Sequence, residues 1–85
     1  MEGRRLILND GTVIDGGSAG LADGFLWLWF PGWTMADVAA KVFNPAVMKN
    51  IYFQYGEEEN TYTGYTVCTN LMLDGGEIAV CMIKG

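Results

Sequence analysis

Two cysteines, Cys68 and Cys81, are the only redox candidates in this sequence. Their spacing of thirteen residues matches neither a CxxC motif nor a four-ligand zinc pattern, and the chain has no histidine to complete a metal site. If Asp74 and Gly75 form a two-residue turn, the cysteines lie directly opposite each other on paired strands, where a disulfide is sterically conceivable. A turn with a bulge at Gly76 would make them a diagonal pair instead. Because cysteine is a frequent small core residue and intracellular thiols stay reduced, we expect two buried, free thiols.

Catalytic groups are scarce in the rest of the chain. Without histidine, the catalytic triads that depend on it are excluded. The acidic residues cluster at predicted turns, where turn formation explains their presence without acid–base catalysis. They are Asp10, Asp15, Asp23, Asp74 and the run Glu57, Glu58 and Glu59. The sequence therefore predicts a non-enzymatic protein with no catalytic, metal-binding or cofactor-binding residues.

Two other segments have the composition of a ligand site, one of a phosphate-binding loop and one of a cation site, but lack the motif. The glycine-rich segment 16–24 contains neither GxGxxG nor GxxxxGKS/T, and it leads into a strand instead of a helix. We expect it to form a mobile loop or an irregular edge. The run Glu57–Glu59 lacks the ligand spacing of a cation site and indicates a solvated hairpin tip.

Charge and hydropathy limit the partners. Ten acidic against five basic residues give a net charge of −5, which disfavours nucleic acid because phosphate binding requires a basic surface. The longest apolar run, residues 25–30, is far shorter than the ~20 residues of a membrane span, and the N-terminal apolar segment is too short for a signal peptide. We expect a cytoplasmic protein, or one assembled into a particle made in the cytoplasm, that binds neither nucleic acid nor membrane.

The segment 25–43 organises the predicted fold. Residues 25–30 form a central strand with Phe25, Trp27 and Trp29 on one face and three apolar side chains on the other. A short helix follows over residues 34–43. Thr34 and Asp37 predict its N-terminal capping box, and Asn44-Pro45 predicts its end.

Turn signals and apolar patterns predict five further strands. A two-residue turn at Asp10-Gly11 would place Leu8 opposite Val13, and Gly64 suggests a bulge within one long strand. The predicted fold is α+β, a single domain over residues 1–85, with about six mostly antiparallel strands and one short helix in the order β-β-β-α-β-β-β, the helix packed on the sheet. The strands cover residues 4–8, 12–15, 25–30, 51–55, 61–73 and 77–84. The predicted core consists of Leu6, Leu8, Val13, Leu26, Leu28, Val38, Val42, Phe43, Ile51, Phe53, Val67, Leu71, Ile78, Val80 and Met82.

The turn signatures and strand patterns resemble a family of small uncharacterised proteins encoded in prophages and mobile regions of Gram-positive bacteria. The matching stretches are LILNDGTVI, the capped helix and GYTVCTNLMLDGGEIAVCMIK. The resemblance implies a virion component or accessory factor and brings no catalytic residues. In that family the segment matching residues 16–33 is more polar, so the tryptophans of this chain are a departure.

The surplus of apolar surface indicates a partner. A helix of about ten residues spans only ~15 Å, too little to shield a six-stranded sheet with strands ~4.8 Å apart. Either the sheet folds back on itself or another subunit covers the second face, and we expect a homodimer or a complex with another protein. The alternative is a small-ligand domain in which Trp27, Trp29, Tyr52 and Tyr65 line a pocket or stack on a sugar or aromatic ring. The candidate interaction surface comprises Trp27, Trp29, Trp33, Tyr52 and Tyr65.

Overall fold

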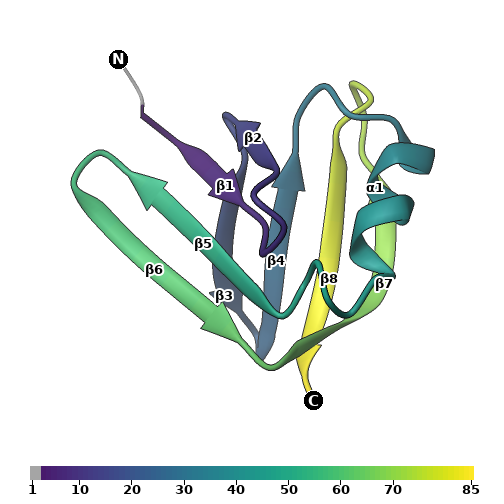
Figure 1. Ribbon diagram of the computed structural model, residues 1–85. Helices are drawn as coiled ribbons and strands as arrows, with labels where there is room; N and C mark the ends of the chain where they lie inside the picture. The colour runs from purple at the N-terminus through teal and green to yellow at the C-terminus, as the bar shows by residue number, and fades with distance from the viewer. Residues whose placement is uncertain (1–2) are drawn as a thin grey trace.

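A computed structural model of the chain describes residues 3–85, which form eight strands and one helix that lies beside them (Figure 1). The first four strands come before the helix and the other four after it. In chain order they are β1 (Arg5–Ile7), β2 (Val13–Asp15), β3 (Ser18–Ala22), β4 (Phe25–Phe30), α1 (Met35–Val42), β5 (Asn50–Tyr55), β6 (Glu58–Thr63), β7 (Tyr65–Met72) and β8 (Ile78–Lys84).

The strands form two antiparallel sheets of four strands each. Sheet A has the order β2-β1-β5-β6, and sheet B has the order β3-β4-β8-β7. The protein is therefore mostly β, and the expected α+β fold with six strands in one sheet is wrong. Two segments account for the difference: residues 16–24 contain strand β3, and the expected long strand 61–73 divides at Gly64 into β6 and β7, which belong to different sheets.

Strand β3 shows why the glycine-rich segment is not a mobile loop. It pairs along its whole length with β4, with Ala19 opposite Leu28 and Gly20 opposite Trp27. Ala19 is buried against the core. The ladder of hydrogen bonds to a strongly apolar neighbour thus outweighs the low strand preference of the glycines.

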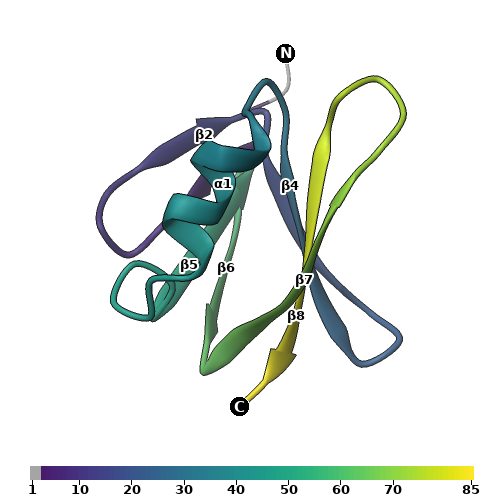
Figure 2. The same ribbon diagram turned by 90° about the vertical axis from the view of Figure 1, so that its right-hand side faces the viewer.

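The chain passes between the two sheets at two corners. The first corner lies at Gly16 and Gly17, which connect β2 at one edge of sheet A to β3 at one edge of sheet B. The second lies at Gly64, which connects the opposite edge strands, β6 and β7. In Figure 2 the sheets stand apart between these corners, and helix α1 lies across the opening. The core fills the space between both sheets and the helix.

Helix α1 has the predicted capping. Its N-cap Thr34 accepts a hydrogen bond from the Asp37 backbone N–H at 3.1 Å, which satisfies one free amide of the first turn. Val38 and Val42 are buried under the helix. In the last turn, the Lys41 Nζ donates to Asp10 Oδ2 at 2.8 Å and ties the helix to the β1–β2 hairpin. This ammonium group and the backbone N–H of Thr12 hold the pKa of Asp10 well below its usual range.

Both hairpins that were expected to have two-residue turns have three-residue loops. In the first, Gly11 N–H donates to the Leu8 carbonyl and Leu8 N–H donates to the Thr12 carbonyl. In the last, Gly76 N–H donates to the Leu73 carbonyl in the same way. Gly11 and Gly76 have φ values of 90° and 83°, the left-handed conformation that closes this type of loop. Each extra loop residue shifts the neighbouring register by one position.

The shift in the first hairpin changes which residues face the core. Leu6 pairs with Ile14, so Ile14 is buried and Val13 is exposed, contrary to expectation. Phe43 and Leu71 are also exposed instead of buried, whereas Phe53 and Val67 lie at the margin of the core. The residues with no exposed surface or almost none are Phe30, Leu6, Leu8, Ile14, Leu26, Leu28, Ile51, Ile78, Met82, Val38 and Val80.

The β5–β6 hairpin projects from the rest of sheet A (Figure 1). Its turn contains Gly56 and Glu57, and β6 forms one edge of the sheet. The side chains of Glu57, Glu58 and Glu59 are all exposed, which confirms the predicted solvated hairpin tip.

Candidate functional site

The outward face of sheet B is the most unusual surface of this protein. Along β4 the side chains of Leu26, Leu28 and Phe30 point into the core, so the alternate residues point outward. Residues that pair across neighbouring strands lie on the same face of the sheet. The pairs that β3, β4, β8 and β7 form therefore define the outward surface, here named the Trp face. It consists of Ser18, Gly20 and Ala22 on β3; Phe25, Trp27 and Trp29 on β4; Ala79, Cys81 and Ile83 on β8; and Thr66, Cys68, Thr69 and Leu71 on β7. None of these residues is charged.

An aromatic ridge runs along β4 on the Trp face. The rings of Phe25 and Trp27 meet edge to face with centroids 6.4 Å apart. The Trp29 indole N–H donates to Glu77 Oε1 at 3.1 Å, just beyond the start of β8, and this bond orients the ring. The ridge is thus built from fixed rings and not from freely rotating side chains.

Rows of small residues flank the ridge. On β3, Gly20 stands opposite Trp27 and has no side chain. On β8, Ala79 stands opposite Trp29 and Cys81 opposite Trp27. Ala79 and Cys81 point outward but are only 3% and 4% exposed. The ridge on β4 therefore has smaller side chains on both sides.

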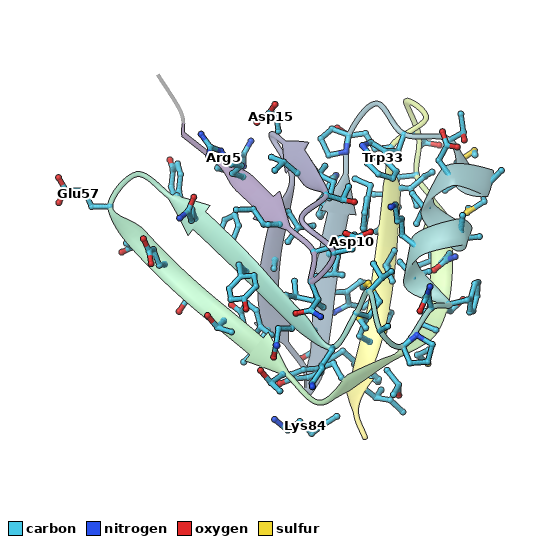
Figure 3. All side chains as sticks on the ribbon, in the orientation of Figure 1. Arg5, Asp10, Asp15, Trp33, Glu57 and Lys84 are labelled. Carbon is cyan, nitrogen blue, oxygen red and sulfur yellow. The ribbon has the colours of Figure 1, made fainter. Side chains whose placement is uncertain are left out.

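The outward face of sheet A has a different chemistry. It carries Arg5 and Asp15, whose side chains approach to 3.9 Å, and Glu59, which accepts a hydrogen bond from Gln54 at 3.4 Å. Arg5, Asp15 and the nearby Glu57 all point into solvent in Figure 3. Charges thus keep this face hydrated, and the uncharged Trp face is not a general property of both sheets.

The structure separates the five aromatic residues of the expected interaction surface. Trp27 and Trp29 lie together on the Trp face, while Trp33 packs its ring on Phe30 at 5.5 Å beside the core. Tyr52 lies on the outward face of sheet A, opposite Ile7. Tyr65 lies at the Gly64 corner with its ring 6.3 Å from that of Tyr62. No single pocket holds all of them.

The expected interaction surface left out three apolar members of the Trp face. Phe25, Leu71 and Ile83 extend the apolar surface around the two tryptophans. Phe25 and Ile83 alternate with core residues in strongly apolar strands, so the signal was present in their spacing. Leu71 could not be found in this way because the register of the last hairpin was assigned one position off.

The two cysteines meet on the Trp face at a β-bulge. Val67 pairs with Met82 and Thr69 with Cys81, so Cys68 is the extra residue of β7. Both thiols are free; Cys81 is buried as expected, but Cys68 is exposed, so the expectation of a buried thiol is wrong for Cys68. Burial raises the pKa of the Cys81 thiol, and the neighbouring Cys68 thiol raises it further.

No protein-family model matches this chain, and comparison with curated proteins and with solved structures finds no match. The site is therefore interpreted from its geometry. Within residues 3–85, no three His, Cys, Asp or Glu side chains are grouped so that they could hold a metal ion. In the same part of the chain, no helix has the length and hydrophobicity needed to span a membrane.

Proposed function

We propose that this chain is a non-enzymatic protein-interaction module and that its Trp face binds a second copy of the chain. The observation that carries the proposal is an uncharged four-stranded face on a protein whose net charge is −5. Because charged residues are depleted at the centres of protein interfaces and aromatic residues are enriched there, the composition of the Trp face fits an interface core. The four strands carry no charged residue on this side, and the carboxylate of Glu77, which binds the Trp29 indole, lies at one end of the face.

The shape of the Trp face favours a second copy over an unrelated protein. The ridge on β4 is off-centre in sheet B, and the small residues of β8 lie beside it. A two-fold axis parallel to the strands, between β4 and β8, would place the ridge of each copy over strand β8 of the other. Such a self-complementary contact is what a two-fold dimer requires.

The size of the Trp face sets the expected affinity. Four strands ~4.8 Å apart with about six residues each at ~3.4 Å give a planar area of roughly 400 Å² per copy. Two copies would bury on the order of 800 Å² of planar area, less than the ~1,200 Å² at which stable specific interfaces begin, and the ridge adds to this area, so the proposed contact is a weak one. We therefore expect a dimer with a dissociation constant in the micromolar range.

In the alternative function, binding of a sugar or aromatic ring, fewer of the expected residues can contact the ligand. Because Tyr52 and Tyr65 lie on other surfaces, such a ligand would contact only Trp27 and Trp29 among the four residues expected to line its pocket. A virion role rests only on the resemblance of the turn and strand patterns and stays a prediction.

Sedimentation equilibrium over low to high micromolar concentrations tests the proposal. The wild-type mass should rise from the 9.3 kDa of one chain to about twice that value. Trp29→Gln should raise the dissociation constant at least tenfold. The indole exposes roughly 100 Å², worth about 2 kcal/mol per copy, while the amide can still donate to Glu77.

Tyr52→Gln is the matched control. Trp29 and Tyr52 are each 38% exposed, but Tyr52 lies on sheet A, so its replacement should leave the dimer unchanged. Ile83→Glu, which places a charge at the end of the Trp face, should also give monomers. A wild-type protein that stays monomeric at high concentration would refute self-association, and equal effects of Trp29→Gln and Tyr52→Gln would show that another surface mediates it.

A further inference from the structure

A second apolar site lies at the corner where β6 passes into β7. A cleft of about 430 Å³, here named the corner cleft, opens between the end of helix α1 at Val42 and Phe43, the connection 45–49, and residues 63–67. Its volume falls within the range of small-molecule sites. Figure 1 shows these segments together at the lower end of the helix, beside the start of β7.

The floor of the corner cleft is continuous with the core. Val42 and Met48 belong to the buried cluster, and Tyr65 and Val67 pack against that cluster from its margin. A ligand in the cleft would therefore contact well-packed side chains that are already held in place. Such a preformed site spares a ligand much of the cost of ordering protein groups.

Phe43 forms an exposed apolar wall of the cleft. Its side chain is 63% exposed at the C-cap of α1, although the sequence predicted a core position. The cap itself is formed by backbone hydrogen bonds from Phe43 N–H to Ala39 and from Asn44 N–H to Lys41, which any residue could supply. The phenyl ring thus adds apolar surface to the cleft without a role in the core.

Two ammonium groups lie at the corner cleft, and Gly85, which carries the terminal carboxylate of this chain, also lines the cleft. Lys49 lines it, and its ammonium group has no hydrogen-bond or ion-pair partner among residues 3–85. The Lys84 Nζ is held at the margin, 3.0 Å from the Thr63 carbonyl oxygen and 4.9 Å from the centre of the Tyr65 ring. No acidic side chain lines the cleft, although acidic residues outnumber basic ones ten to five in the chain.

We propose that the corner cleft binds a small amphipathic carboxylate, with its apolar chain against Val42, Phe43 and Val67 and its carboxylate beside Lys49 and Lys84. An apolar floor selects a hydrocarbon chain or ring, and the two ammonium groups complement an anion. At about 30 Å³ per water-sized group, the volume accommodates on the order of 14 non-hydrogen atoms, the size of dodecanoate. The corner cleft shares Thr66 with the Trp face, but the proposal does not depend on the proposed dimer.

Dodecanoate is a direct probe of the site. Titration of ¹⁵N-labelled protein with dodecanoate below its micelle concentration should shift the backbone amides of residues 42–49 and 63–67 and should saturate at one ligand per chain. Dodecyltrimethylammonium has the same chain and the opposite charge, so it should bind at least fivefold more weakly. Shifts confined to the Trp face, equal affinities for the two ions, or no binding would each overturn the proposal.

Charge variants separate the corner cleft from general attraction to the protein. Lys49→Gln and Lys84→Gln should each weaken dodecanoate binding about two- to fivefold, the range of partly exposed ion pairs. Glutamine at position 84 can still donate to the Thr63 carbonyl. Arg5→Gln makes the same change in net charge on sheet A and should leave the affinity unchanged. An equal loss in all three variants would overturn the assignment of the carboxylate to the corner cleft.

A second pair of variants tests the apolar wall. Phe43→Ala should weaken binding of dodecanoate at least fivefold. Leu21→Ala is the matched control because Leu21 is 61% exposed, almost as much as Phe43, but lies on β3 far along the chain from the cleft. If both variants bind dodecanoate as the wild type does, the ligand does not use the corner cleft.

Discussion

Replacement of Gly17 by alanine should be among the most damaging single changes in this protein. Gly17 is buried at the corner between β2 and β3. A Cβ atom there would lie 2.8 Å from Ile14 Cγ2, 2.9 Å from the Trp29 carbonyl oxygen and 3.0 Å from the Ile14 carbonyl oxygen. Two of these three atoms are backbone, so they can move only if one of the sheets moves.

The expected loss follows from these contacts. Overpacking in a core costs about 1–3 kcal/mol, and the rigid neighbours place Gly17→Ala near the upper end, at about 3 kcal/mol. For a domain of this size, 1 kcal/mol corresponds to roughly 4–8 °C, so the melting temperature should fall by more than about 10 °C. Urea unfolding followed by tryptophan fluorescence at low micromolar concentration, where the proposed dimer would contribute little, measures the difference.

Gly20→Ala provides the control. Gly20 lies on β3 three residues later, and a Cβ atom there meets nothing within 4 Å. Alanine at this position should be neutral or should stabilise the strand by about 0.5–1 kcal/mol. If the Gly17 and Gly20 variants unfold at the same urea concentration, the chain does not make the close corner that joins the two sheets.

Two further predictions concern titratable groups. The folded protein lowers the pKa of Asp10 below its unfolded value of about 4, so ionised Asp10 stabilises the fold above that pH, and this contribution is lost as the pH falls through the folded pKa. The difference in unfolding free energy between wild type and Asp10→Asn, measured by urea unfolding, should therefore be largest near neutral pH and should shrink in acid. A difference that does not change with pH would contradict the Lys41 ion pair. In thiol labelling of the native protein, Cys68 should react quickly and Cys81 only after unfolding, with two free thiols found in denaturant; equal native rates would contradict the bulge at Cys68.

Local signals predicted the elements of segment 25–43. The apolar run gave strand β4 with its observed bounds, and the capping residues gave helix α1 to within one residue at each end. These features depend on neighbours in sequence, such as the Thr34 hydroxyl and the Asp37 N–H, so a single sequence contains the information.

Sheet assignment and register depend on information that the sequence expresses less directly. The sequences NDG and DGG suit both a two-residue and a three-residue hairpin, and the one-residue difference exchanged Val13 for Ile14 in the core. In β7, the bulge at Cys68 shifts the pairing with β8 by one residue halfway along the strand. No single register therefore describes the pairs on both sides of the bulge. Gly64 indicated an interruption between residues 61 and 73, but no local pattern predicts that β6 and β7 belong to different sheets.

The candidate site was predicted in part for the same reason. Trp27 and Trp29 stand out by composition and share a face through simple alternation, so their grouping followed from the sequence. The addition of Tyr52 and Tyr65 required knowledge of which sheet each strand joins, and here composition alone was misleading.

The acidic edge strand β6 also affects what kind of assembly the chain can build. Strands that pair edge to edge can add further chains without limit, and such growth produces fibres. A second chain placed along β6 would bring its own Glu58 and Glu59 to within one strand spacing, ~4.8 Å, of the same charges. In the proposed dimer, in contrast, each Trp face covers the other, so no further copy can bind there. For this mode of association, raising the concentration should increase the number of dimers and not the length of a polymer.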